Sequence, residues 1–389
     1  MRLKSSGDKM TKILENEFLD YEDVLIKPNR SITASRKDVQ LERNFRFYNS
    51  PRHLNCVPIF ISNMSTCGVI SMANVAKDYK IITCLHKHYD LGYLVSYFKD
   101  LVYPDVPNEW DMDNYNLEDL QYVWYSLGIQ DKELSKLEDF IQQTNIQPNL
   151  CVDVANGHID SFVDKLKLIR GICPNSIIMA GNVVLEDMIY ELIHYGKADI
   201  IKVGLGSGSR CLTRSVSGIG MPQLSACINS SNTAHGLKKE EKRLALVCGD
   251  GGIKEIGDFA KGFGTGSDFL MAGGMFQGFE ENEGEWVEYN CPTYNMPHPK
   301  ETLYGFGEKK YRALKVYGMS SKTAQEKHDE FKDYRASEGD EAWIGCKGEV
   351  EPFIKEILGG LRSACTYVGA TCLKDFAKCT TFIKTRRIK

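Results

Sequence analysis

The sequence has no apolar run long enough to cross a membrane, since its longest runs are strand-sized and a membrane helix needs roughly 20 apolar residues. Its first residues lack the apolar core of a signal peptide. It also lacks a basic block: the net charge is −4, acids and bases are interspersed, and residues 384–389 are expected to form a solvated tail. These absences argue against nucleic-acid and membrane partners and predict a cytoplasmic protein.

The sequence also lacks a Cys-x-x-Cys pair, although it contains 13 cysteines, an odd and scattered set. This pattern argues against a disulfide framework and a structural zinc site, and it favours a reducing compartment. Cys365, Cys372 and Cys379 recur every seven residues, which suits one buried helix face better than a metal site. The 389 residues are 42% hydrophobic and 26% charged, as in ordinary globular proteins, and would make one large domain or two.

Eight short apolar runs recur along the chain, and most are separated by segments of helical periodicity. The runs cover 57–62, 81–85, 122–127, 150–152, 177–180, 199–203, 244–248 and 268–271. Such alternation is typical of parallel strands that are buried on both faces. We predict an α/β fold, a single closed (β/α)8 TIM barrel. An open doubly wound sheet is the alternative, but its glycine-rich fingerprint is missing after the first run.

The prediction also divides the chain into an arm and the barrel. Residues 1–20 would form an N-terminal arm, and residues 21–389 the catalytic barrel with a C-terminal tail. The stretch at about 276–345 would contain a mobile loop and flap, because Glu, Asn, Gly and Pro cluster in it.

Nearly every run ends in polar or glycine residues, and in such a barrel the carboxyl ends of the strands form the active face. The side chains expected around this mouth are Asn63, His86, Lys87, Asp153, Asn182, Cys211 and Asp250. Seven unrelated buried core residues would be a poor explanation for this set.

The loop 202–214 follows the sixth run and has glycines at positions 204, 206 and 208, before Cys211. Glycine permits an irregular loop whose amides and carbonyls approach a ligand, a monovalent ion or a phosphate. Such a loop can also present a thiol as a nucleophile. Taken alone, the pattern fits a small core cysteine equally well.

Glycines also follow the last two runs, as Asp250-Gly251-Gly252 and Gly273-Gly274. Barrel loops at these ends commonly hold a phosphate by backbone N–H groups, and a carboxylate there suits a ribose diol. Two ordinary turns are the alternative. Residues 331–339 are either a solvated loop or a flap that supplies Glu338, and residues 359–369 suit tight packing or a subunit edge.

These motifs together resemble those of the IMP dehydrogenase and GMP reductase family. The resemblance extends over about residues 17–385 and rests on Ser62-Asn63-Met64, Gly206-x-Gly208-Ser209-x-Cys211-x-Thr213-Arg214, Gly218-Ile219-Gly220-x-Pro222-Gln223, Asp250-Gly251-Gly252 and Tyr317-Gly318-Met319-Ser320. The GMP reductase branch is favoured by 86–89, 153–157, 179–183, 334–339 and 363–369. Only 32 residues separate Tyr89 from Tyr122, too few for the regulatory CBS domain pair of IMP dehydrogenases.

The resemblance implies NADPH-dependent reductive deamination of GMP to IMP and ammonia, in purine nucleotide salvage. Cys211 would form a thioimidate at purine C2, and Thr213 and Glu338 would relay the proton. IMP dehydrogenase, which oxidises IMP to XMP with NAD, and a non-catalytic purine-nucleotide binder are the alternatives.

The resemblance also assigns residues to ligands. GMP would be held by Ser209, Asp250, Gly251, Gly252, Gly273, Gly274, Gly318, Met319, Ser320, Arg335, Ala336, Ser337 and Gly339. NADPH would be held by Lys87, Asp153, Val154, Ala155, Leu205, Gly206, Met319, Tyr334, Arg335, Ser363, Ala364, Cys365 and Thr366, with Ser35 and Arg36 from a neighbouring subunit of a homotetramer. A potassium ion would lie at Gly206, Gly208, Cys211, Thr213 and Arg214.

Four residues depart from the family pattern as we read it. Ser207 stands at a usual proline, which should loosen the loop, and Ser65 stands at a usual aspartate. Arg210 and Leu212 flank the nucleophile, where a cation would affect the thiol or the ion site. An insert within 286–312 is longer than expected.

Overall fold

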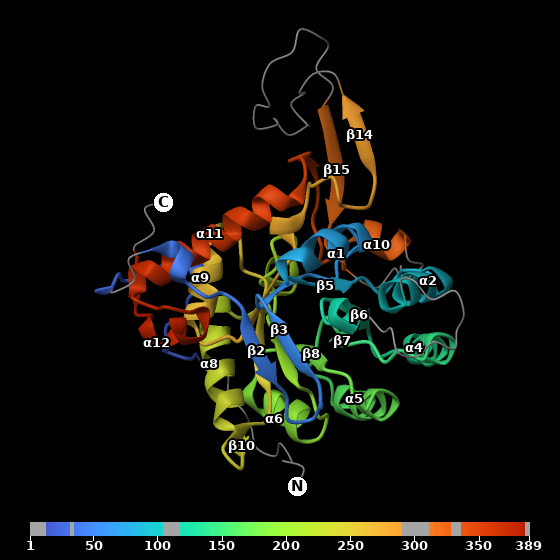
Figure 1. Cartoon of the computed structure of the whole chain (residues 1–389), viewed down its shortest axis with the longest axis horizontal. Coiled ribbons are helices and arrows are strands. Elements are labelled where there is room, and N and C mark those ends of the chain that lie inside the picture. Colours follow the sequence, from blue (N-terminus) through green and yellow to red (C-terminus); the bar gives the residue numbers. More distant parts are fainter. Residues whose placement is uncertain (1–12, 32–34, 104–116, 290–310, 328–335, 386–389) are drawn as a thin grey trace.

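A computed structural model describes residues 13–31, 35–103, 117–289, 311–327 and 336–385. Eight parallel strands close into a barrel at the centre of the molecule, with helices around it (Figure 1). In barrel order the strands are β4 (Ile59–Ile61), β5 (Ile82–Leu85), β6 (Val123–Leu127), β7 (Leu150–Asp153), β8 (Ile178–Val183), β9 (Ile200–Val203), β12 (Leu246–Asp250) and β13 (Phe269–Ala272). Each of the eight expected runs overlaps one of these strands, so the predicted (β/α)8 barrel is confirmed.

The strands are largely apolar because both of their faces are covered, and several of their polar residues lie toward the carboxyl ends. Inside the barrel, Phe60 of β4 meets Trp124 of β6 edge-on, with ring centroids 4.9 Å apart. The antiparallel hairpin of β2 (Arg43–Arg46) and β3 (His53–Cys56) places Phe45 4.2 Å from Phe269 of β13. Side chains therefore fill the barrel interior, and the hairpin packs onto it.

Helices surround the barrel, and the longer ones bury an apolar face against it. They are α1 (Ile70–Ala76), α2 (Leu91–Val102), α3 (Leu117–Leu120), α4 (Asp131–Thr144), α5 (Asp160–Ile172), α6 (Glu186–His194), α7 (Thr213–Ser217), α8 (Gln223–Gly236), α9 (Ile256–Gly264), α10 (Lys322–Lys327), α11 (Val350–Val368) and α12 (Phe376–Cys379). Within the described residues, no helix has the length and apolarity that a membrane span requires.

The remaining elements are short. The 3-10 helices are η1 (Tyr21–Asp23), η2 (Arg36–Asp38), η3 (Lys77–Tyr79), η4 (Gly274–Phe276) and η5 (Leu373–Asp375). Antiparallel pairs join β1 (Val24–Ile26) to β17 (Phe382–Lys384) and β10 (Lys238–Lys239) to β11 (Lys242–Arg243).

An antiparallel sheet lies within the segment that the sequence suggested as loop and flap. Its strands are β14 (Trp286–Tyr289), β15 (Tyr311–Tyr317) and β16 (Glu341–Gly345), and β14 and β15 project from the barrel (Figure 1). Most of the suggested insert and the first half of the flap lie outside the described residues. The mobility of this segment stays a prediction.

The expectation that three cysteines share one helix face was wrong. Cys365 is buried in α11, but that helix ends at Val368, and the next residue, Gly369, has a left-handed φ of 78° that favours glycine. Cys372 therefore lies in the following turn, and Cys379 ends a separate helix.

Candidate active site

Four of the polar residues expected at the barrel mouth belong to one network, and a lysine binds three of them directly. Lys202 of β9 donates from Nζ to Asp153 Oδ1 at 2.8 Å, Asn182 Oδ1 at 2.8 Å and Asp250 Oδ2 at 2.6 Å. Asn63 donates to Asp153 Oδ2 at 3.0 Å, and Asn182 donates to Asp250 Oδ2 at 2.8 Å. The carboxyl ends of β4, β7, β8, β9 and β12 thus meet in one hydrogen-bonded network.

The pKa shifts in this network follow from its charges. Burial works to raise the pKa of the Asp153 carboxyl, but the Lys202 ammonium and the Asn63 amide lower it below its usual value. Burial works to lower the pKa of Lys202, yet the Asp153 and Asp250 carboxylates raise it well above the usual value. Asp153 and Lys202 are therefore both charged at neutral pH.

The Cys211 thiol stands in the loop after β9 and is partly exposed rather than packed in the core. It donates to Thr213 Oγ1 at 3.2 Å, and Thr213 donates from Oγ1 to Glu338 Oε2 at 2.6 Å. A thiol, a hydroxyl and a carboxylate thus form a continuous donor chain. Such a chain can move a proton from sulfur to Glu338 or back.

Backbone pairing brings Glu338 to the cysteine loop. Leu212 N donates to Glu338 O at 2.7 Å, and Asp340 N donates to Arg210 O at 2.9 Å. On its other side, Glu338 N donates to Ser320 O at 3.1 Å. Three segments that are far apart in the sequence are therefore held together around the thiol.

The glycine turns at the last two barrel strands lie against the same loop. Gly252 N donates to Ser207 O at 2.8 Å, and a Cβ on Gly274 would lie 2.2 Å from Ser209 Oγ. The Ser207 hydroxyl donates to Asp250 O at 2.8 Å and so links the cysteine loop to the end of β12, and the expected loosening of this loop stays a prediction. Arg210 directs its guanidinium to Asp340, at 3.4 Å.

Comparison of the sequence with known proteins identifies its family. A family model described as IMP dehydrogenase / GMP reductase domain matches residues 18–388. The chain belongs to the IMP dehydrogenase / GMP reductase family. Among similar family members, GMP reductase 1 of Homo sapiens is 42% identical over 378 residues, which is 96% of this chain and 97% of the relative. GMP reductase of Caenorhabditis elegans is 41% identical (95% and 93%), and GMP reductase of Escherichia coli O81 (strain ED1a) is 40% identical (96% and 96%).

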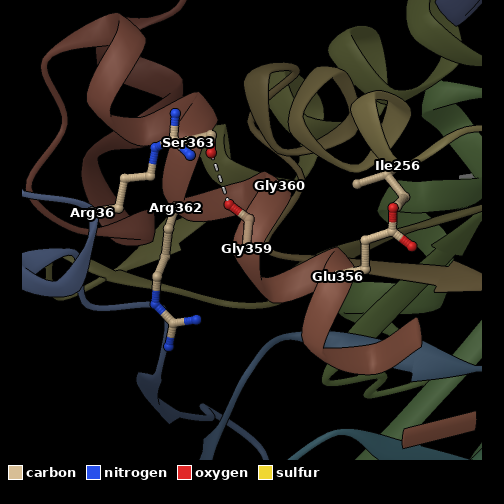
Figure 2. A pocket seen from close by; sticks show the side chains of 7 residues that line it. All are labelled: Arg36, Ile256, Glu356, Gly359, Gly360, Arg362 and Ser363. Atoms are coloured by element: carbon tan, nitrogen blue, oxygen red, sulfur yellow. Dashed lines mark hydrogen bonds between the residues drawn. The ribbon is translucent and has the colours of Figure 1, made fainter. Parts of the chain in front are cut away.

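Some residues that the family resemblance assigned to the cofactor lie in a separate pocket. It has a volume of about 510 Å³ and is lined by Arg36, Ile256, Glu356, Gly359, Gly360, Arg362 and Ser363 (Figure 2). Ser35 accepts a hydrogen bond from Lys37 N and caps η2 beside it. Thr366 is partly exposed, as is Ala364, whereas Cys365 is fully buried and presents no surface in this chain.

Other cofactor and ion assignments have these surroundings. Lys87 pairs with Glu133 at 2.9 Å, near the mouth, and Val154 and Ala155 follow β7. Arg214 binds Asp20 at 2.7 Å and Met221 O at 2.6 Å, and these bonds with Asp20 lower that carboxyl's pKa although burial opposes the shift. Leu205 and Gly206 lie in the loop, while Tyr334 and Arg335 lie outside the described residues.

The substrate assignments on the flap side lie on two adjoining segments, the turn at 318–321 and residues 336–339. Gly318 and Gly339 are buried, Met319 and Ser320 are partly exposed, and Ala336 and Ser337 are exposed. A Cβ on Gly318 would lie 2.7 Å from Arg210 O, so the turn lies directly beside the cysteine loop.

Sequence reasoning assigned no role to Lys202, although this lysine joins the network. The available signal was its position: a charged residue within the buried apolar strand β9, where burial requires a partner.

Proposed function

We propose that this protein is a GMP reductase that converts GMP to IMP and ammonia. The Cys211–Thr213–Glu338 donor chain at the barrel mouth carries the proposal, because a purine amine is a poor leaving group that needs a nucleophile and a proton donor. The relatives named GMP reductase, about 40% identical over nearly the whole chain, support the same reaction.

The donor chain suggests how the residues act. The thiol proton passes through Thr213 Oγ1 to Glu338, and the resulting thiolate forms a bond to purine C2. The same relay then protonates the amine, which leaves as ammonia and leaves a thioimidate on Cys211. Hydride addition at C2 and cleavage of the S–C2 bond yield IMP and return the thiolate.

NADPH is the proposed cofactor, and it would supply that hydride. Lys87 and residues 153–155 flank the mouth network and would bind its nicotinamide end. Arg36 and Ser363 line one pocket of a single chain, so a cofactor that reaches a neighbour's Arg36 would reach that neighbour's Ser363 as well. Two arginines in this pocket, Arg36 and Arg362, are suited to bind the phosphates of the cofactor. The homotetramer is proposed on the family resemblance alone.

A potassium ion is proposed in the cysteine loop, since potassium prefers neutral carbonyl oxygens. Thr213 Oγ1 is occupied by Glu338, and the Arg214 side chain by Asp20, so backbone oxygens at Gly206, Gly208 and Cys211 are the better candidates. The described part of the chain has no group of three or more His, Cys, Asp or Glu side chains suited to a metal. A cytoplasmic location is proposed as well, and the cysteines of the described residues are free thiols.

The decisive experiment follows NADPH oxidation and ammonia release by the purified protein with GMP. Turnover that disappears in Cys211→Ala, with GMP affinity retained in calorimetry, is the expected result. NAD reduction with IMP would instead indicate an IMP dehydrogenase. GMP binding without turnover would indicate a non-catalytic nucleotide binder.

A further inference from the structure

Lys202 is the only charged residue within strand β9 and is 2% exposed. Its ammonium group has three protons, and it donates to three side-chain oxygens at 2.6 to 2.8 Å. Its donor capacity is therefore complete within the protein. Lys202 is thus unsuited to bind a ligand or donate a proton, and its effect must pass through its partners.

Its two carboxylate partners have different proposed tasks. Asp250, at the end of β12, belongs to the proposed GMP site, and Asp153, at the end of β7, belongs to the proposed NADPH site. Both donors to Asp250 reach Oδ2, which leaves Oδ1 without a hydrogen bond among the described residues. That oxygen can accept from a ribose hydroxyl while the other is held.

We infer that Lys202 is a positioning residue that holds both carboxylates in place and thereby couples the GMP and NADPH sites. The inference deepens the proposed function and depends on it. One ammonium contacts both carboxylates directly, and the amide of Asn182 adds a second connection between Lys202 and Asp250.

Removing the ammonium should affect the two carboxylates in particular, because it removes the cation that balances their charges. Without Lys202, the Asp153 and Asp250 carboxylates would face each other with no cation between them, and like charges at one site make one of them take up a proton more readily. The raised pKa of Lys202 and the lowered pKa of Asp153 agree with this balance.

The test is Lys202→Met, which keeps an unbranched side chain and removes the charge. We expect KM to rise about tenfold or more for both GMP and NADPH, with a smaller change in kcat. We also expect kcat/KM of the variant to improve relative to wild type as the pH falls from about 8 to about 6, because protonation of one carboxyl relieves the repulsion. Lys378→Met, at an exposed lysine on α12, is the matched control and should behave as wild type.

Two further variants separate positioning from damage to the fold. Adding Asp153→Asn to Lys202→Met should restore the KM for GMP but not that for NADPH. Asn182→Ser, useful if Lys202→Met does not fold, should raise the KM for GMP more than that for NADPH, because its amide donates to Asp250. Unchanged KM values, parallel pH profiles, or no recovery in the double variant would overturn the inference.

Failure of the proposed function would look different. In that case the wild-type protein itself would show no GMP turnover with NADPH. Calorimetry of GMP binding with and without NADP would still test the coupling, which should be present in wild type and lost in Lys202→Met.

Discussion

Glu338 ends a donor chain that begins at the Cys211 thiol, and its carboxylate accepts from Thr213 at 2.6 Å. Glu338→Gln keeps a side chain of the same shape but removes the proton acceptor. We expect kcat for GMP to fall by about 10²- to 10⁴-fold, the usual contribution of general acid–base catalysis, with little change in KM. Steady-state NADPH oxidation measures both constants.

Asp340→Asn is the matched control for this substitution. Asp340 lies two residues along the same segment, and its exposed carboxylate pairs with Arg210 at 3.4 Å. Loss of such a surface pair should change the rate by less than about threefold. Equal kcat for Glu338→Gln and wild type would contradict a proton relay through this carboxylate.

At the scale of residues, the sequence predicted the parts of the site that depend on spacing. Cys211 and Thr213 are two residues apart, and their contact is local. The composition of residues 331–339 suggested Glu338 only as one of two alternatives, and its pairing with Thr213, 125 residues away, came from the resemblance. Lys202 was missed because its partners come from three other strands, and only the closed barrel brings them together.

Among the elements, the segment that carries Glu338 depends on a glycine. A Cβ on Gly339 would lie 2.5 Å from Ser321 N and 2.9 Å from Ser321 Cα, and backbone atoms cannot yield as a flexible side chain can. Gly339→Ala should therefore move this segment off the turn at 318–321 and separate Glu338 from Thr213. We expect kcat to fall about tenfold or more, as displaced catalytic groups do, with a small change in melting temperature. Kinetics and thermal unfolding on one preparation measure the two effects.

Gly171→Ala is the control for the glycine substitution. Gly171 lies in α5, and a Cβ there would meet no atom within 4 Å. Alanine should leave kcat unchanged and stabilise the helix by roughly 0.5–1 kcal/mol. A Gly339→Ala variant with wild-type kcat would show that the segment has room to adjust.

The same scale shows which elements a sequence can predict. Each barrel strand is mostly apolar, so its own residues indicate that it is buried, as in β6. The sheet of β14, β15 and β16 is less apolar, and its strands pair across long connections. Patterns in short windows of sequence therefore do not predict its strand pairing, and the segment was predicted to be a loop.

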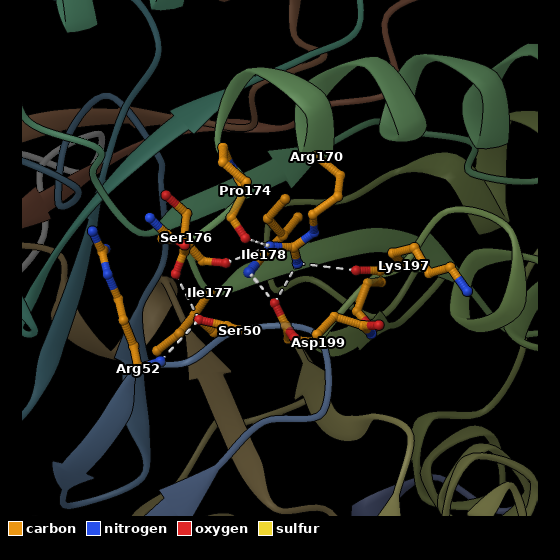
Figure 3. Close-up of polar contacts among 12 residues, drawn as sticks. Ser50, Arg52, Arg170, Pro174, Ser176, Ile177, Ile178, Lys197 and Asp199 are labelled. Carbon is orange, nitrogen blue, oxygen red and sulfur yellow. Dashed lines mark hydrogen bonds and ion pairs between the residues drawn. The ribbon is translucent and has the colours of Figure 1, made fainter. Parts of the chain in front are cut away.

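For the whole molecule, two buried carboxylates affect stability in opposite ways. Each directly precedes a barrel strand: Asp199 comes before β9 and Asp268 before β13. Burial works to raise the pKa of Asp268, but His235, Arg43 and Arg243 lower it below its usual value. Burial raises the pKa of Asp199 to about 6, although Arg170 contacts it at 2.5 Å and Ile178 N donates to it at 2.8 Å (Figure 3). Asp268 thus stabilises the fold above the pKa of the unfolded chain, whereas ionised Asp199 reduces its stability.

This difference predicts the pH dependence of Asp199→Asn. Between about pH 4 and about pH 6 the folded protein holds the Asp199 proton and the unfolded chain does not, so the wild-type free energy of unfolding falls as the pH rises. The variant lacks this term, and wild type should lose on the order of 3 kcal/mol relative to it across that range, since each pKa unit corresponds to about 1.4 kcal/mol. Urea unfolding at several pH values measures the difference. Asp164→Asn, at an exposed carboxylate on α5, should run parallel to wild type, and parallel curves for Asp199→Asn would contradict the raised pKa.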